Sequence, residues 1–161
     1  MEKKRIYIIL AIVFALIAGG IIYSRLSSKE ISVKLYYYNE AQDLALDGEI
    51  SCSVKGIAPV TRTIRTSNPI KDAIQLLISS GVTSAEESRG YSSEFPHSGF
   101  KLVSSDLASD GTLTLTFSEV PGFTSGGACR TGVLAEEIKY TALQFPEVKN
   151  VVIKPDELFQ P

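Results

Sequence analysis

The sequence predicts an α+β fold preceded by one N-terminal transmembrane helix, and three observations lead to that prediction. Residues 6–23 form an uncharged, predominantly apolar run. Several later segments alternate apolar and polar residues with the period of two that is typical of strands, and two others place apolar residues at helical spacing. The 161 residues provide for one domain and hardly for two, and 44% hydrophobic with 21% charged residues excludes a disordered or low-complexity chain.

The apolar run at 6–23 has the length of a membrane span. A helix rises roughly 1.5 Å per residue, so these 18 residues extend about 27 Å, close to the hydrocarbon thickness of a bilayer. Tyr7 and Tyr23 stand at its ends, where interfacial aromatic residues are common. We expect an uncleaved transmembrane helix. A signal peptide cleaved near Ala18-Gly19-Gly20, and a buried helix of a soluble protein, are the alternatives.

The charge distribution predicts the orientation of this segment. Residues 1–29 carry five basic and one acidic side chain, whereas residues 30–161 carry 11 basic and 17 acidic ones. The positive-inside bias favours a cytoplasmic segment at 1–5, followed after the helix by a linker at 24–30 and a domain at 31–161 outside the cytoplasmic membrane. An acidic domain does not favour nucleic acid as a partner.

The elements expected after the linker follow the order β-β-α-(α)-β-β-α-β. Asn68-Pro69 is a helix start that Gly81 closes, and two overlapping capping boxes at 83–87 predict a short second helix. Asp110-Gly111 is typical of a hairpin turn. Residues 39–58 show little periodicity and are expected to be a loop or a hairpin. Strands are expected at 31–38, 60–65, 100–108, 112–117 and 148–154, and long helices at 69–80 and about 131–145, with Thr131 as the cap of the last.

The expected packing is a layer of helices on a sheet. The hairpin at 110–111 excludes a wholly parallel sheet, and without its first strand the element order is that of a split β-α-β-β-α-β fold. We therefore expect a mixed, mainly antiparallel sheet with the two main helices on one face.

Cys52 and Cys129 are the only cysteines and lie 77 positions apart. A zinc or redox pair would normally be a close C-x-x-C, and an oxidising compartment permits a disulfide. Closing a loop of this length would stabilise the fold by roughly 4 kcal/mol. Two unpaired cysteines remain an alternative, and a catalytic thiol would need the only histidine, His97, as its base.

Residue types that carry catalysis or bind metal are scarce. One histidine and two cysteines exclude a histidine-rich metal site and a Cys₄ zinc site, and the G-x-S-x-G and Walker A patterns are absent. His97 is expected in an exposed loop. Glu136 and Glu137 point roughly 100° apart on a helix and are expected on a solvated face. We therefore expect no enzyme, no cofactor and no metal.

Three groups of residues are candidates for binding a ligand or a partner. Glycines before a helix can present backbone N–H groups to an anion with help from an arginine, or they can permit a tight bend at the disulfide. An arginine on a strand can pair with a carboxylate or face a partner. Tyrosines on the first strand can stack on sugars or lie half-buried. The residues concerned are Gly126, Gly127 and Arg130 in the first group, Arg62 in the second, and Tyr36 and Tyr38 in the third.

Several pieces of the sequence together carry a resemblance to a known family. They are Pro59-Val60-Thr61-Arg62, Asn68-Pro69 with Ala73-Ile74-Gln75-Leu76-Leu77, Phe95-Pro96, Asp110-Gly111-Thr112-Leu113-Thr114-Leu115-Thr116-Phe117-Ser118 and Ile138-Lys139-Tyr140-Thr141-Ala142-Leu143-Gln144-Phe145-Pro146-Glu147-Val148-Lys149-Asn150-Val151. With these pieces, the stretch from Val60 to Ile153 resembles the GerMN domain, a bacterial extracytoplasmic module of spore germination and sporulation proteins. The common Leu-Leu-x-Gly-Pro helix end is replaced here by Leu76-Leu77-Ile78-Ser79-Ser80-Gly81-Val82, and the two cysteines are not general family features.

The resemblance implies a protein of the bacterial cell envelope with no established enzymatic activity, and some relatives resemble ring-building modules of membrane-spanning complexes. We therefore expect a single-pass membrane protein whose domain docks to an envelope protein or self-associates. Binding of a cell-wall glycan such as peptidoglycan, or of a small anion, is the alternative.

Overall fold

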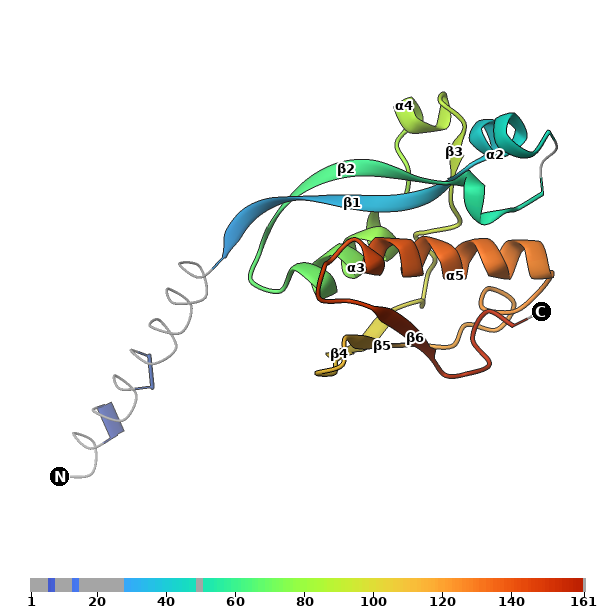
Figure 1. The fold of residues 1–161 in the computed structure, drawn as a ribbon. Coiled ribbons are helices and arrows are strands. Elements are labelled where there is room, and N and C mark those ends of the chain that lie inside the picture. Colours follow the sequence, from blue (N-terminus) through green and yellow to red (C-terminus); the bar gives the residue numbers. More distant parts are fainter. Residues whose placement is uncertain (1–5, 8–12, 15–27, 49–50, 161) are drawn as a thin grey trace. The chain divides into compact units, whose positions relative to one another are not determined.

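The computed structural model describes residues 6–7, 13–14, 28–48 and 51–160 (Figure 1). The chain forms two compact units, one made of Met1–Ile31 with Thr63–Ser67 and the other of Ser32–Arg62 with Asn68–Pro161. Most of the apolar run at 6–23 lies outside the described residues, so the transmembrane helix stays a prediction. In the part of the chain that is described, no helix is long and apolar enough to cross a membrane.

The described elements follow the predicted order with two additions near the start of the domain, a helix and a single 3-10 turn, and one short extra strand in the middle. The strands are β1 (Lys29–Asn39), β2 (Ile57–Thr66), β3 (Tyr91–Ser92), β4 (Leu102–Leu107), β5 (Thr112–Phe117) and β6 (Asn150–Lys154). The helices are α2 (Glu40–Asp47), the 3-10 helix η1 (Val54–Gly56), α3 (Pro69–Ser80), α4 (Ser84–Glu87) and α5 (Ala128–Leu143).

The loop or hairpin predicted at 39–58 is wrong for residues 40–47, which form α2. The side chain of Asn39 accepts a hydrogen bond from the Gln42 backbone N–H and so caps the helix, and Gly48 ends it in the left-handed conformation at a φ of 78°. This helix was not predicted because its sequence contains no apolar stripe that would be buried. In the structure its two leucines, Leu44 and Leu46, are both exposed.

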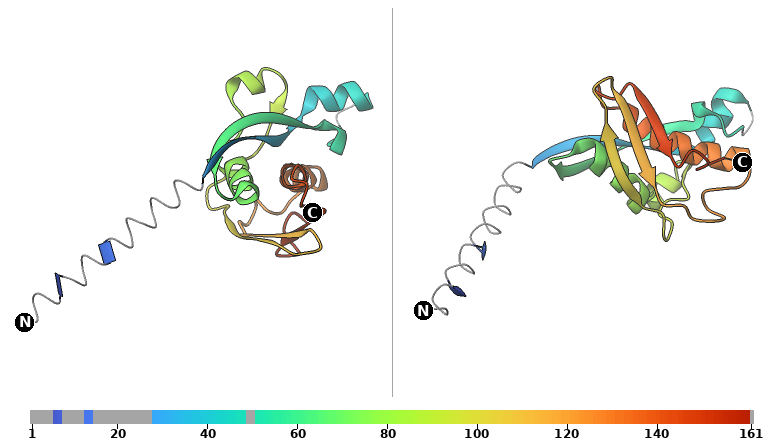
Figure 2. Two further views of the ribbon diagram at one scale, coloured as in Figure 1. Left: turned by 60° about the vertical axis from the view of Figure 1, so that its left-hand side comes forward. Right: turned by 90° about the horizontal axis from the view of Figure 1, so that it is seen from below.

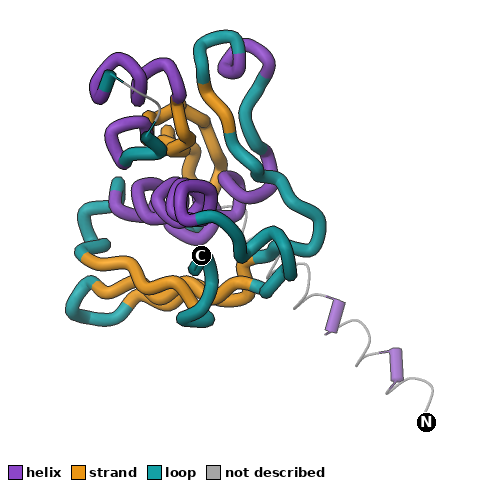
Figure 3. Tube along the Cα trace, turned by 90° about the vertical axis from the view of Figure 1, so that its right-hand side faces the viewer, coloured by secondary structure: helices purple, strands orange, loops and turns teal. Residues whose placement is uncertain are grey.

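The strands form two three-stranded sheets, so the prediction of one sheet with helices on one face is wrong. One sheet has the order β2-β1-β3, and the other has the order β4-β5-β6. In the second, the predicted hairpin of β4 and β5 is antiparallel, and β5 and β6 are parallel. Helices α3 and α5 lie between the two sheets (Figure 2, left), and Figure 3 shows α5 end-on in the same middle layer.

The two helices of the middle layer have the predicted apolar faces. In α3 the buried side chains are Ile70, Ala73, Ile74, Leu77 and Ile78. Gly81 ends α3 as predicted, at a φ of 64°, and a Cβ there would come within 2.6 Å of the carbonyl oxygen of Phe95, so a side chain would not fit.

Helix α5 begins earlier than predicted. Its first residue is Ala128 and its cap is Gly127, whose extended backbone allows the helix to start three residues before Thr131. Thr131 lies inside the helix instead, where it is buried and its hydroxyl donates to the Gly127 carbonyl oxygen over 3.3 Å.

Polar side chains of α5 replace a neighbouring strand along β1. Three alternate residues of β1 donate their backbone N–H groups to side chains on one face of α5 and to its C-terminal cap, Gln144, over 2.7 to 3.0 Å. The amide of the last of these side chains also donates back to the strand, over 2.6 Å. Since β1 pairs with β3 only through its last two residues, these contacts satisfy an edge that would otherwise be open. The pairs are Lys34 with Gln144, Tyr36 with Thr141 and Tyr38 with Glu137.

Replacing Thr141 by valine should destabilise the domain by about 1–3 kcal/mol, because the half-buried Tyr36 N–H would lose its acceptor. Thr114→Val is the matched control, since Thr114 lies half-buried on β5 and its hydroxyl makes no hydrogen bond to another described residue; a change within about 0.5 kcal/mol is expected there. Chemical denaturation of both variants measures the difference. Equal stability of the two would contradict a strand-like role for α5.

Candidate functional site

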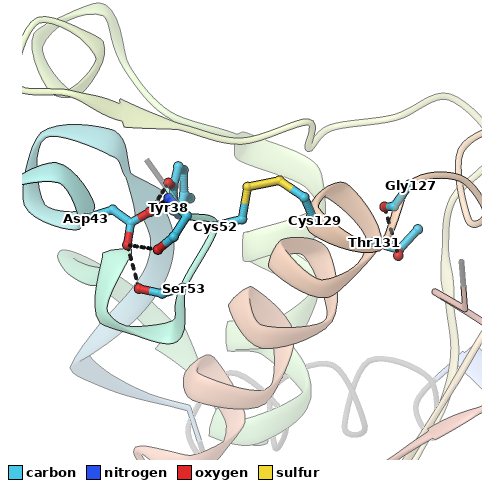
Figure 4. The surroundings of a disulfide bond; sticks show 8 residues. Tyr38, Asp43, Cys52, Ser53, Gly127, Cys129 and Thr131 are labelled. Atoms are coloured by element: carbon cyan, nitrogen blue, oxygen red, sulfur yellow. Dashed lines mark hydrogen bonds between the residues drawn. A yellow bond between two sulfur atoms is a disulfide. The ribbon is translucent and has the colours of Figure 1, made fainter. Parts of the chain in front are cut away.

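The predicted disulfide is present between Cys52 and Cys129 (Figure 4). It joins the segment between α2 and η1 to the first turn of α5, and the two Cα atoms lie 5.4 Å apart, within the ordinary range for a disulfide. Cys52 is half-buried and Cys129 is exposed. The bond therefore lies at the surface of the domain and connects two segments that are 77 positions apart in the sequence.

A pocket of about 240 Å³ lies beside the disulfide. The end of β1, the residues of and after β3, and the first two turns of α5 enclose it. Two of the predicted binding residues, Tyr38 and Arg130, line this pocket, whereas Tyr36, Gly126 and Gly127 do not. The lining consists of the two cysteines, Tyr38, Ser92, Ser93, Glu94, Arg130, Val133 and Leu134.

The guanidinium group of Arg130 is occupied by contacts within the domain. Its Nη2 donates to Glu94 Oε2 over 2.5 Å, and its Nη1 donates to the carbonyl oxygens of Phe123 and Ser125 over 2.9 and 3.1 Å. Gly126 has a φ of 140° and leads into Gly127, the cap of α5. Of the two roles predicted for these glycines, the arrangement agrees with a tight bend at the disulfide. It does not favour an anion site, because the positive charge of Arg130 is already paired with Glu94.

Tyr38 is an integral part of the fold rather than an open stacking surface. It is buried, and its hydroxyl donates to Asp43 Oδ2 over 2.5 Å. Burial, together with the hydrogen bond to the Asp43 carboxylate, raises the pKa of Tyr38 to about 12. Tyr36, the other tyrosine of this strand that was predicted to bind a ligand, is half-buried. Its ring centroid lies 5.8 Å from that of Tyr140.

Asp43 accepts hydrogen bonds from both residues that flank Cys52 and so holds this segment in place. Its buried carboxylate accepts hydrogen bonds from the Ser53 hydroxyl over 2.5 Å and the Ser51 backbone N–H over 2.9 Å, as well as from Tyr38 (Figure 4). These donors, with Ser53 contributing most, hold the pKa of Asp43 well below its usual range. Both neighbours of Cys52 are therefore tied to β1 through one carboxylate.

Arg62 pairs with a carboxylate, which was one of its two predicted roles. Its two terminal nitrogens each donate to Glu86 over 2.7 Å, and the Thr83 backbone N–H donates to the same carboxylate over 2.8 Å. Glu86 is buried, and the hydrogen bonds from Arg62 lower its pKa to about 2. Such a bidentate pair ties β2 to α4 and leaves little of the guanidinium to a partner.

The expectation of a solvated Glu136–Glu137 pair is wrong for Glu137. Glu137 is fully buried, accepting from the Tyr38 N–H and, over 2.7 Å, from the Ser93 hydroxyl, whereas Glu136 pairs with Lys139. Burial raises the pKa of Glu137 to about 8. Its place three residues after Leu134 on the apolar stripe was the signal that could have revealed its burial.

His97 is exposed as predicted, and its ring stacks on Phe123 with the centroids 4.0 Å apart. Within the described ranges, no group of three His, Cys, Asp or Glu residues is placed to hold a metal ion.

These features define a small disulfide-bonded α+β domain with a pocket at the disulfide. The family model described as "Germane: Sporulation and spore germination" matches residues 34–157, most of the chain. The protein therefore belongs to this family, as the resemblance to GerMN domains predicted.

Two solved structures are similar to this chain. The first GerMN domain of the sporulation protein GerM from Bacillus subtilis has 19% sequence identity and a TM-score of 0.51, with 80% of this chain and 86% of that chain covered. The tandem GerMN domains of the same protein have 23% identity and a TM-score of 0.45, with 78% and 39% covered. A search of curated proteins found no match. At these identities the first structure supports the fold alone.

The buried Glu137 should make stability fall as the pH rises. Its pKa of about 8 in the folded state lies above the ordinary value near 4.5, so the folded protein holds a proton that the unfolded chain releases between these values. Glu137→Gln keeps the acceptor for Tyr38 and does not titrate. We expect the stability of the wild type relative to this variant to decrease between about pH 4.5 and 8.

Urea denaturation of both proteins at several pH values measures this difference. Glu136→Gln serves as the matched control, because Glu136 is a partly exposed neighbour on the same helix. A difference between wild type and Glu137→Gln that is independent of pH would contradict the burial of an acid at this position.

Proposed function

We propose that this protein is a single-pass membrane protein of the bacterial cell envelope, whose extracytoplasmic GerMN-like domain docks to another envelope protein or to a second copy of itself and catalyses no reaction. Membership of the sporulation and germination family supports an envelope role. The apolar run at 6–23, with basic residues before it, supports the anchor and its orientation.

The observation that carries the proposal is the edge strand β4. It ends the sheet β4-β5-β6, so its outer edge pairs with no strand among the described residues. Val103 and Leu107 are 66% and 41% exposed on this strand, and the pairing with β5 is irregular between Leu102 and Ser104. An apolar strand edge invites main-chain pairing with a strand of another protein.

A second candidate function is the binding of a cell-wall glycan or a small anion in the pocket at the disulfide. The pocket itself favours it, because Tyr38 and two serines belong to its lining. Docking remains the preferred function because Arg130 is already paired with Glu94, so the pocket offers an anion no free charge from that residue.

Val103→Lys should weaken docking, because a lysine on an edge strand opposes pairing with a further strand. Leu44→Lys is the matched control, since Leu44 is 48% exposed on α2, away from β4 in the fold (Figure 1). If the domain self-associates, sedimentation of the full-length protein in detergent should show an association constant reduced by about tenfold or more for Val103→Lys alone.

If the wild type stays monomeric at every concentration, cross-linking in membranes tests a different partner. Cross-linked products that are lost with Val103→Lys and kept with Leu44→Lys support docking through β4. Equal products from both variants would reject this edge as the contact.

A further inference from the structure

The Cys52–Cys129 bond is open to a reagent from solution. Cys129 is exposed and Cys52 is half-buried, and both residues line the pocket of about 240 Å³. A thiolate can therefore approach the bond from the pocket without unfolding the domain. The remaining wall of the pocket is largely apolar, with Val133 and Leu134 on one side.

The two sulfurs differ in how well their surroundings stabilise a thiolate. Cys129 is the second residue of the 16-residue helix α5, whose first turn contains no acidic residue and whose cap, Gly127, provides no side chain. The N-terminal end of a helix lowers the pKa of a cysteine placed in it. The charged neighbours Arg130 and Glu94 neutralise each other.

Cys52 has the opposite surroundings. It lies outside the helices, between Ser51 and Ser53, which both donate hydrogen bonds to the buried carboxylate of Asp43. A thiolate at Cys52 would add a second negative charge near that carboxylate, which raises the pKa of the thiol. The thiol of lower pKa is the better leaving group in disulfide exchange. These surroundings give the lower pKa to Cys129, so we expect Cys129 to leave when the bond is attacked.

We propose that Cys52–Cys129 is a thiol–disulfide exchange site for a dithiol reductant, in which Cys52 is attacked and Cys129 leaves. The incoming thiolate forms a bond to Cys52 Sγ while the bond between the two sulfurs breaks, and its electron pair leaves with Cys129 as a thiolate. The second thiol of the reductant then attacks its own sulfur in the mixed disulfide and releases Cys52, so the reductant ends as a disulfide and both cysteines are reduced.

The network around Asp43 keeps the domain folded after this reduction. Ser51, Ser53 and Tyr38 stay hydrogen-bonded to the carboxylate, so the segment that carries Cys52 remains fixed to β1. Only the link from this segment to the first turn of α5 is lost. Since both cysteines belong to the wall of the pocket, its shape then depends on the redox state of the bond.

The site of attack can be mapped on the full-length oxidised protein in detergent. A brief exposure to reduced glutathione, followed by quenching with N-ethylmaleimide and peptide mass spectrometry, should place glutathione predominantly on Cys52 and maleimide on Cys129. Glutathione predominantly on Cys129, or a bond that reacts only in denaturant, would overturn the proposal.

The thiol pKa values provide an independent test. In Cys52→Ser the rate of alkylation of Cys129 should follow a pKa about one unit or more below the ordinary 8.5, and in the matched Cys129→Ser the pKa of Cys52 should lie above it. The reverse order would refute the assignment. The double variant Cys52→Ser/Cys129→Ser should still unfold cooperatively, and loss of its folded state would show that the bond is structural instead of exchangeable.

Discussion

The fold depends on the hydrogen bonds between the backbone of β1 and the polar face of α5. Glu137, Thr141 and Gln144 accept from alternate residues of the strand, which is the work that a neighbouring strand does in an ordinary sheet. This contact fixes the helix under one sheet and leaves its apolar stripe to the other. It also requires Glu137 to be buried, and burial of a carboxyl group favours its neutral form.

The same contact places the pocket. Tyr38 lines the pocket, and it also donates to Glu137 through its backbone N–H and to Asp43 through its hydroxyl, so this residue at the end of β1 is held by both α5 and α2. The disulfide closes the remaining side. Charged side chains form salt bridges within the domain. Arg130 pairs with Glu94, and Arg62 pairs with Glu86. Arg130 therefore contributes no free charge to the pocket.

Charged groups such as Arg130 and Arg62 are paired within the domain, whereas the outer edge of β4 pairs with no strand among the described residues and carries exposed apolar side chains. The proposed docking edge and the proposed exchange site lie on different elements, because the disulfide joins α5 to the segment between α2 and η1 and includes no residue of β4.

Local sequence patterns were enough to predict the elements whose signals lie in neighbouring residues. The capped start of α3 at Asn68-Pro69 and the turn at Asp110-Gly111 occur where their residues predict them, because caps and turns depend on neighbouring backbone groups. The pairing of Cys52 with Cys129 was also predicted, from the presence of just two cysteines and the expectation of an oxidising compartment. Only the tertiary structure decided the number of sheets, the burial of Glu137 and the neutralisation of Arg130. Each of these depends on contacts between residues far apart in the chain, such as Tyr38 with Glu137 and Glu94 with Arg130, and no local pattern specifies which distant partner a polar group will meet.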